Sequence, residues 1–276
     1  RELTEMNQSA QLGTLFGRKE ELRQLRAAIQ HRESRLVCGP MDAGKTSLIQ
    51  AAITELCEPE RRNCFCWSGP ATGRELVSFL LRGIYLTGDS FVRRKIQADG
   101  TAPDSVDRWL ARQSALRLRG ILFTACEKGA YQFFLDHFPP PTHNMARLLK
   151  DIMYRCRTPI YLAARGFGQG DVGYAWSLYW NDALRIHLGP LPDRAARELL
   201  ESCIQKFGLA SLHLRGFREE ILHLSAHLPG SIVKMCALAA GSRYRYGDQI
   251  KTKLVHVDYL LRSNAAVVSH SQNFFQ

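Results

Sequence analysis

The sequence predicts an α/β protein in which a five-stranded parallel sheet is followed by a small all-helical domain. Three observations lead to this fold class. Five short and nearly all-apolar segments alternate with helical patterns. The first of these segments runs directly into a glycine-containing loop and a helix, and strand patterns stop at Pro192. Apolar strands that alternate with helices are typical of a parallel sheet whose two faces are both covered.

The first part of the chain contains the helix, strand and loop from which the fold starts. Helical periodicity predicts a helix over 16–30, opened by a Phe-Gly-Arg turn, and a strand, a loop and a helix follow over 34–57. The apolar run at 63–69 is the second strand, and a helix over 73–86 comes after it.

The segment over 104–129 is rich in arginine. Its apolar residues recur at helical spacing, so we expect one long amphipathic helix with an N-cap at Asp104 or Ser105. Its arginines form either a stripe that faces DNA or another subunit, or an ordinary solvated helix face. They are Arg108, Arg112, Arg117 and Arg119.

Three further strands complete the predicted sheet. They lie at 131–138, 159–165 and 185–191, with helical segments at 142–155 and 171–183 between them. Only helices are expected after Pro192, and these cover 193–209, 216–228, 230–247 and 252–264.

The length leaves room for two packed domains, since the chain has 276 residues and domains commonly contain about 100–200. The hydrophobic content of 45% and the charged content of 23% are ordinary for a globular protein. We expect a core over 12–191, a helical lid domain over 192–262 and a C-terminal tail over 263–276.

The charge balance favours a polyanionic partner. The chain carries 37 Lys and Arg against 26 Asp and Glu, a net charge of +11. Nucleic acid, in the form of duplex DNA, is the first candidate. Most of the basic residues are arginines, which also serve ATP sites and subunit interfaces, so contact with nucleic acid remains open at this point.

Cysteine usage and hydropathy indicate a cytoplasmic protein without a membrane partner. The eight cysteines are scattered and several lie in apolar runs, as expected for buried thiols in a reducing cytosol. The sequence has no signal peptide, and no apolar run approaches the ~18 residues that a membrane span needs.

The loop GPMDAGKTS carries the strongest functional signal. It follows a short strand, precedes a helix and matches the pattern G-x-x-x-x-G-K-[ST]. Gly39 and Gly44 allow the backbone N–H groups to approach a triphosphate, Lys45 can reach its β- and γ-phosphates, and the Thr46 hydroxyl can ligate Mg²⁺. The alternative is a glycine-rich turn that contains Lys-Thr by chance. We expect an ATP site that comprises Gly39, Pro40, Met41, Asp42, Ala43, Gly44, Lys45, Thr46 and Ser47.

A carboxylate that completes the magnesium site is expected at Asp136. This residue ends the apolar run Gln132-Phe133-Phe134-Leu135, where a buried strand can bring it next to the loop as a Mg²⁺ ligand, direct or through water. His137 follows, where many hydrolases of this class have a second carboxylate that polarises water. Either His137 acts as a weak base, or it is structural and hydrolysis is slow.

Two arginines are candidates for contact with the γ-phosphate. Arg165 ends the fourth strand, and ligands of parallel sheets lie beyond the carboxyl ends of the strands, so it is a candidate sensor. Arg185 precedes the fifth strand, where an arginine finger for a neighbouring subunit's nucleotide could lie. The alternative for both is an ordinary arginine of a basic chain.

Several short motifs in this order resemble those of AAA+/STAND-type P-loop ATPases. The nearest branch in appearance contains the origin-recognition and helicase-loader ATPases and the bacterial and archaeal ATPases similar to them. The resemblance covers about residues 12–260. The motifs that carry it are Phe16-Gly17-Arg18, GPMDAGKTS, FFLD, Arg165 and Ala226-His227-Leu228-Pro229-Gly230.

The resemblance implies a nucleotide-binding core and a small helical lid, with ATP in the crevice between them. It also implies that Gly17, Arg18 and Pro229 lie near adenine. His227 stands where relatives usually have glycine, and His137 replaces the expected acid. No winged-helix segment is recognised after residue 262.

Four aromatic residues follow the glycine-rich segment GFGQGDVG: Tyr174, Trp176, Tyr179 and Trp180. Aromatic side chains beside arginine can stack on nucleic-acid bases. The alternative is that they pack against the sheet or line a subunit interface.

These features predict a slow ATPase that acts as a nucleotide-dependent switch, forms a homo-oligomer or a larger assembly, and assembles on or regulates DNA. A signalling or defence ATPase with effector domains outside these residues is the alternative. A small-molecule kinase fits less well, because kinases of this fold generally lack a helical C-terminal domain.

Overall fold

The computed structural model describes residues 15–69, 71–99 and 106–272. These residues form two compact units. The sheet unit comprises the described parts of 20–40 and 45–188, and the helical unit comprises 15–19, 41–44 and 189–272. The loop GPMDAGKTS is therefore divided: its tip, Met41–Gly44, belongs to the helical unit and its two ends belong to the sheet unit.

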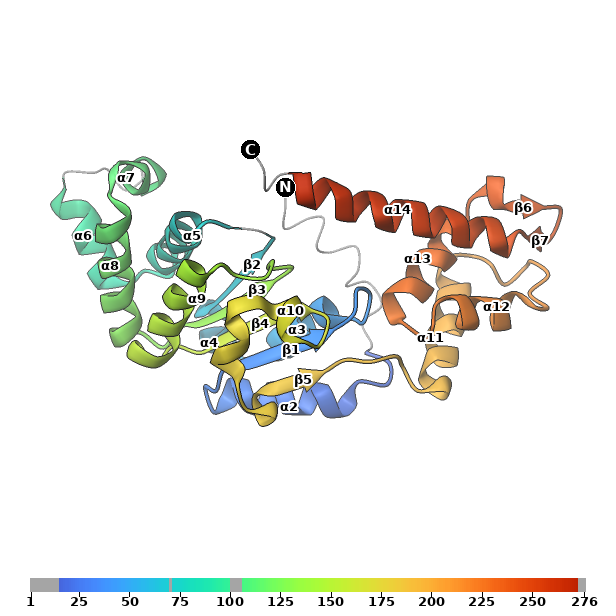
Figure 1. The fold of residues 1–276 in the computed structure, drawn as a ribbon, viewed down its shortest axis with the longest axis horizontal. Helices are drawn as coiled ribbons and strands as arrows, with labels where there is room; N and C mark the ends of the chain where they lie inside the picture. The colour runs from blue at the N-terminus through green and yellow to red at the C-terminus, as the bar shows by residue number, and fades with distance from the viewer. Residues whose placement is uncertain (1–14, 70, 100–105, 273–276) are drawn as a thin grey trace. The chain divides into compact units, whose positions relative to one another are not determined.

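The sheet unit contains the predicted five-stranded parallel sheet, in the order β2-β3-β4-β1-β5 (Figure 1). β4 therefore lies between β1 and β3. In register, Gly39 is opposite Arg165, and Ser68 is opposite Asp136, so the carboxyl ends of four strands meet at one edge. The strands are β1 (Arg35–Gly39), β2 (Cys64–Ser68), β3 (Gln132–Asp136), β4 (Ile160–Arg165) and β5 (Arg185–His187).

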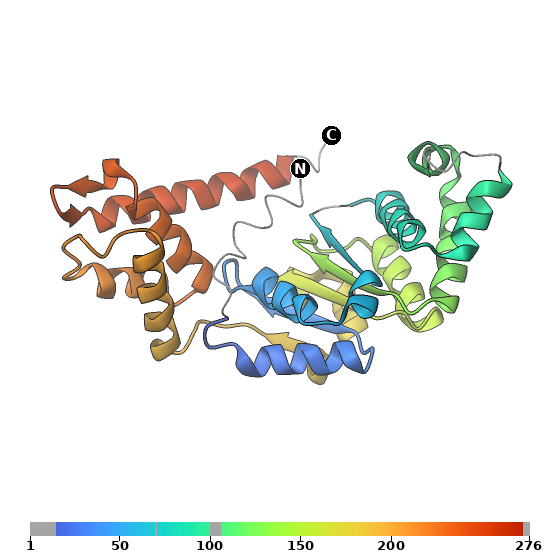
Figure 2. The same cartoon turned by 180° about the vertical axis from the view of Figure 1, so that it is seen from behind.

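Helices cover both faces of this sheet (Figures 1 and 2). α2 (Lys19–Gln30) and α3 (Lys45–Thr54) lie on one face, where the Tyr161 hydroxyl donates to the carbonyl oxygen of Ala28. α5 (Gly73–Leu86) and α9 (His143–Lys150) lie on the other face, and their buried side chains form one hydrophobic cluster with alternate residues of β1, β3 and β4. This alternation explains why β3 and β4 are apolar almost throughout.

The segments that were predicted as helices around β4 differ in type. α9 continues into a π-helical turn, Asp151–Arg155. After β4, the chain forms a single turn α10 (Gln169–Val172), followed by two 3₁₀ helices, η5 (Gly173–Tyr179) and η6 (Asp182–Leu184). A short helix, α4 (Glu58–Arg62), precedes β2.

The prediction of one long helix over 104–129 was wrong. The chain forms α7 (Val106–Arg112) and α8 (Ala115–Lys128), after α6 (Ser90–Ala98), and the expected caps at 104 and 105 lie outside the described residues. The break occurs because Ser114 is extended and its hydroxyl accepts the backbone N–H of Arg117 at 3.3 Å, which caps α8.

The break also divides the predicted arginine stripe. Arg117 forms an ion pair with Asp99, and Arg119 pairs with Asp151. Arg108 and Arg112 are exposed on α7.

The helical unit consists of α11 (Asp193–Lys206), α12 (Phe217–Leu224), α13 (Pro229–Ala239) and α14 (Thr252–Gln272), which share one hydrophobic cluster. Residues 263–272, where a tail was expected, continue α14. None of the described helices is long and apolar enough to cross a membrane.

The expectation that no strand follows Pro192 was wrong in one place. After a 3₁₀ turn, Ser242–Tyr244, two short antiparallel strands pair, β6 (Arg245–Tyr246) and β7 (Gln249–Ile250). The two residues between them are Gly-Asp, and Gly247 adopts a φ of 61°, which favours glycine and allows a two-residue hairpin loop.

Candidate nucleotide-binding site

The phosphate loop has the predicted strand, loop and helix context. β1 ends at Gly39 and α3 begins at Lys45. Gly44 adopts a φ of 91°, a conformation that only glycine adopts without strain. The first turn of α3 contains no acidic side chain, so nothing there opposes the attraction of its N–H groups for an anion.

The Lys45 side chain folds over the sheet-unit end of this loop. Its ammonium group donates to the carbonyl oxygens of Gly39 at 2.8 Å and of Pro40 at 2.7 Å. These acceptors are neutral, whereas a phosphate oxygen would form a charge-assisted and stronger hydrogen bond. The lysine is therefore positioned at the loop that the sequence assigned to phosphate.

The two expected magnesium ligands, Thr46 and Asp136, both lie close to the His137 ring. Thr46 lies in the first turn of α3, and its hydroxyl oxygen is 3.2 Å from Nε2 of His137. Asp136 ends β3, is 7% exposed, and accepts the backbone N–H of His137 at 2.9 Å. Nε2 of His137 is 3.6 Å from Oδ2 of Asp136. A hydroxyl and a carboxylate oxygen are thus held near one another at the carboxyl edge of the sheet.

The backbone of His137 has an unusual conformation. Its φ of 50° lies in the left-handed region, which costs a non-glycine residue about 1–2 kcal/mol. The side chain is half exposed. Strained residues of this kind cluster at functional sites, and this one directly follows Asp136.

Arg165 and Arg185 have different surroundings. Arg165 is exposed at the end of β4, and no carboxylate of the described residues lies within 4.0 Å of its guanidinium. The guanidinium of Arg185 lies 3.6 Å above the Trp176 ring and donates to the carbonyl oxygens of Tyr179 at 2.8 Å and Trp180 at 3.1 Å. Arg185 therefore stabilises its own loop, and a role as an arginine finger would require these contacts to break.

The tip of the loop is fixed by side chains of the helical unit, which the sequence analysis did not anticipate. The Asp42 side chain is 9% exposed, and its carboxylate accepts hydrogen bonds from Lys234 at 2.7 Å and from the Tyr259 hydroxyl at 2.9 Å. The N–H of Gly230 donates to the Asp42 carbonyl at 2.8 Å. Burial, together with the Asp42 carboxylate, raises the pKa of the Tyr259 phenol above its ordinary value.

The three residues that the resemblance linked to adenine lie with this tip in the helical unit. Arg18 is 5% exposed and donates to the backbone carbonyl oxygens of Gly189 and Ala43. A Cβ atom on Gly17 would lie 2.6 Å from Cβ of Ala195, so only glycine fits there. Pro229 is the first residue of α13, and its Cγ atom lies 3.4 Å from the position that a Cβ atom on Gly44 would occupy.

His227 adopts a φ of 57°, the region that glycine occupies without strain. Its ring nitrogen Nε2 is 3.9 Å from the Asp193 carboxylate, and its carbonyl oxygen accepts the N–H of Leu191 at 3.0 Å. The backbone at this position thus has a conformation that favours glycine, although the residue is histidine.

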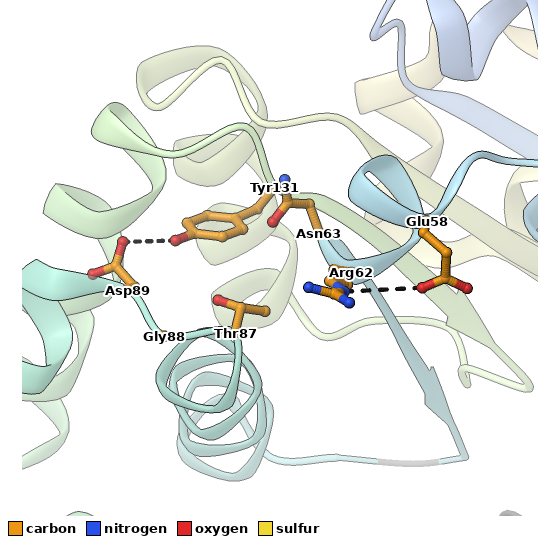
Figure 3. Close-up of a pocket in the computed structure, with 7 residues that line it drawn as sticks. All are labelled: Glu58, Arg62, Asn63, Thr87, Gly88, Asp89 and Tyr131. Carbon is orange, nitrogen blue, oxygen red and sulfur yellow. Dashed lines mark hydrogen bonds and ion pairs between the residues drawn. The ribbon is translucent and has the colours of Figure 1, made fainter.

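A separate hollow of about 490 Å³ lies in the sheet unit (Figure 3). Asn63 and Tyr131 immediately precede β2 and β3, so the hollow lies at the amino ends of these strands, away from Asp136. The Tyr131 hydroxyl donates to Asp89 at 2.7 Å, and burial with this neighbour raises the pKa of Tyr131. No residue of the predicted ATP site lines it; its lining is Glu58, Arg62, Asn63, Thr87, Gly88, Asp89 and Tyr131.

Comparison of the sequence with protein-family models gave no match, and comparison with curated proteins gave none. Comparison with solved structures, in contrast, found proteins of similar structure. A Walker-type ATPase of Pyrococcus abyssi superimposes with a TM-score of 0.59 at 18% identity, over 94% of this chain and 75% of that one. The Aeropyrum pernix Orc1 protein, solved in complex with DNA, gives a TM-score of 0.56 at 15% identity, over 89% of this chain and 66% of that one. This chain therefore shares its fold with a Walker-type ATPase and with an Orc1 protein.

Proposed function

We propose that this protein binds Mg-ATP and hydrolyses it slowly, as a nucleotide-dependent switch. The observation that carries the proposal is the proximity of Thr46, Asp136 and His137 beside the G-x-x-x-x-G-K-T loop. The fold, which is that of P-loop ATPases, supports the same chemistry.

The residues present fit a magnesium–nucleotide complex. Mg²⁺ prefers oxygen ligands and commonly binds through one or two protein oxygens plus phosphates, which suits the Thr46 hydroxyl and the Asp136 carboxylate. When bound, Mg²⁺ neutralises charge on the phosphate oxygens. Lys45 would exchange two neutral carbonyl oxygens for phosphate oxygens, and Arg165 would contact the γ-phosphate.

Slow hydrolysis follows from the surroundings of His137. Its ring is within hydrogen-bond distance of Thr46 and close to Asp136, the two groups assigned to the metal. An imidazole held there is less available to polarise an attacking water than a free carboxylate would be. ATP would then persist long enough to hold one state of a switch.

A role on DNA is the second part of the proposal. The net charge of +11 favours a polyanion, and the similar Orc1 structure is a complex with DNA. We propose that ATP promotes assembly of several copies on duplex DNA. A signalling ATPase that works without nucleic acid is the competing function.

The test is light scattering of the wild-type protein and Lys45→Ala, with no nucleotide, with ADP and with a slowly hydrolysed ATP analogue, each with and without duplex DNA. ATP affinity is measured on the same samples by calorimetry. We expect growth in size only with both the analogue and DNA. Lys45→Ala should weaken ATP binding by roughly 10- to 150-fold, the equivalent of one charged hydrogen bond, and abolish the growth.

Lys253→Ala, an exposed change on α14, is the matched control and should behave as wild type. Unchanged ATP binding in Lys45→Ala would overturn the proposed site. ATP binding by a protein that stays monomeric in every condition would leave the site intact, reject the DNA assembly and favour the signalling function.

A further inference from the structure

The 3₁₀ helix η5 sorts the four aromatic residues of its segment into two groups. A 3₁₀ helix has three residues per turn, so residues three apart share a face. Tyr179 is fully buried and its hydroxyl donates to the carbonyl oxygen of Ile160 at 3.0 Å, and Trp176 packs under Arg185. Tyr174 is 60% exposed and Trp180 is 71% exposed. Two of the four rings are therefore packed, as one alternative expects, and two are exposed.

The two exposed rings lie on the same side of η5. Tyr174, Ser177 and Trp180 are spaced by three residues and all are exposed. Trp180 directly follows η5 and keeps helical backbone angles, with φ −61° and ψ −32°. Six residues of a 3₁₀ helix rise about 12 Å. This is the length of roughly three to four stacked nucleotides at 3.4 Å each.

A basic face of α9 lies alongside these rings. His143, Arg147 and Lys150 are exposed and recur at spacings of four and three residues, so they share one face, which Tyr154 continues. Both ends of this face contact η5. The His143 ring is 5.4 Å from the Tyr174 ring, and the Tyr154 hydroxyl donates to the carbonyl oxygen of Leu178 at 3.0 Å.

The positive charge of this face is not neutralised locally. In the described part of the chain, no carboxylate lies within 4.0 Å of Arg147 or Lys150. The acidic neighbours are engaged elsewhere: Asp151 pairs with Arg119, the Asp171 carboxylate accepts the N–H groups of residues 167 and 168, and Asp182 pairs with His187.

We propose that this surface binds single-stranded nucleic acid. We call it the aromatic–basic face and define it as His143, Arg147, Lys150, Tyr174, Ser177 and Trp180. Tyr174 and Trp180 stack on unpaired bases, and Arg147 and Lys150 contact the phosphates between them. Stacking on exposed aromatic rings beside a cationic groove is the general means by which proteins hold single strands without sequence preference.

The unneutralised charge favours this partner over a protein. Unpaired lysine is depleted in protein interfaces, whereas it suits a phosphate backbone. Duplex DNA offers phosphates but keeps its bases stacked inside the helix, so the rings would gain nothing from it. The aromatic–basic face therefore selects single strands, and it does so without ATP hydrolysis.

The test is fluorescence anisotropy with a labelled 20-nucleotide oligothymidylate and a matched 20-base-pair duplex, at several salt concentrations. Wild-type protein should bind the single strand more tightly. Trp180→Ala and Tyr174→Ala should each weaken single-strand binding by about 5- to 150-fold and leave duplex binding within twofold. Arg147→Ala with Lys150→Ala should lower the slope of log affinity against log salt by about 1.4, the value for two lost phosphates.

Two controls keep the result specific. Tyr246→Ala removes a 77% exposed ring in the helical unit and should bind as wild type. Trp180→Phe keeps a ring at this position, so it should retain single-strand binding but lose the quenching of tryptophan fluorescence that stacking on a base causes.

Three results would overturn the proposal: no single-strand binding by the wild type, wild-type affinity in Trp180→Ala and Tyr174→Ala combined, or an equal loss of duplex binding in these variants. A change of oligomer size in them, with single-strand binding intact, would instead assign the face to contacts between copies. Circular dichroism and ATP binding, measured on each variant, separate these outcomes from misfolding and from failure of the nucleotide site.

Discussion

The ends and the tip of the phosphate loop are held by different kinds of interaction. At the ends, backbone structure dominates: β1 pairs with β4 and β5, and α3 starts at Lys45. At the tip, side chains dominate, because the Asp42 carboxylate is bound by Lys234 and Tyr259. The ends therefore depend on backbone pairing within the sheet, whereas the tip depends on two particular side chains, 192 and 217 positions further along the chain.

One motif can therefore be stabilised by two kinds of interaction. A change at the sheet end should alter the chemistry of phosphate and metal with little effect on stability. A change at the tip should first alter the stability of the helical unit.

The largest effect is expected for Asp136→Asn. The amide keeps the size of the side chain but removes the charge that would hold Mg²⁺, so the gain in ATP affinity that Mg²⁺ provides should fall by about 10- to 100-fold. Calorimetric titration of ATP with Mg²⁺ and with EDTA measures this gain. Asp107→Asn, which alters an exposed ion pair with Arg82, is the control. If Mg²⁺ raised the ATP affinity of Asp136→Asn as much as that of the wild type, the assignment of Asp136 as a magnesium ligand would be wrong.

A smaller effect is expected for Gly230→Ala. The added Cβ would lie 2.8 Å from Cβ and 2.9 Å from Cα of Asp42, so the tip or α13 must shift. We expect a loss of about 1–3 kcal/mol in the free energy of unfolding, measured in urea by circular dichroism.

Gly73→Ala is the matched control for this change. Among the residues that the structure describes, a Cβ there meets only Leu148, at 3.8 Å, so stability should be unchanged or slightly higher. Equal behaviour of the two alanine variants would show that the tip is not closely packed on α13.

The smallest effect is expected for Tyr259→Phe, which removes a hydroxyl that donates to Asp42 at 2.9 Å and lies 2.8 Å from the Ser231 hydroxyl. We expect a loss of about 0.5–1.5 kcal/mol at pH 8. The pKa of Tyr259 is raised in the folded state, so this contribution is complete below the unfolded value of about 10 and is lost as pH rises above it.

Urea unfolding of wild type and Tyr259→Phe at pH 8 and pH 10.5 measures both expectations. Tyr246→Phe, at a 77% exposed position, corrects for general alkaline effects. A difference between wild type and Tyr259→Phe that grows with pH would contradict the role given to this hydroxyl.

Most of the sheet unit could be predicted from sequence because its signals are local. All five strands were located, and the helix over 73–86 has the predicted bounds. The errors arose where one residue interrupts a continuing pattern. Ser114 caps a new helix within an unbroken amphipathic period, and the Gly247 turn forms a hairpin within a predicted helix.

Sequence alone was enough to locate the strand, loop and helix that carry Lys45 and Thr46, and the strand that ends at Asp136. Apolar periodicity and glycine geometry act over a few residues, so they can be recognised without a structure. Tertiary structure alone decided that His137 meets Thr46 across 91 positions, that Asp42 binds Lys234, and that Tyr174 and Trp180 are exposed. These features depend on sheet register and on which helix face is packed, and no local pattern encodes a contact between segments so far apart.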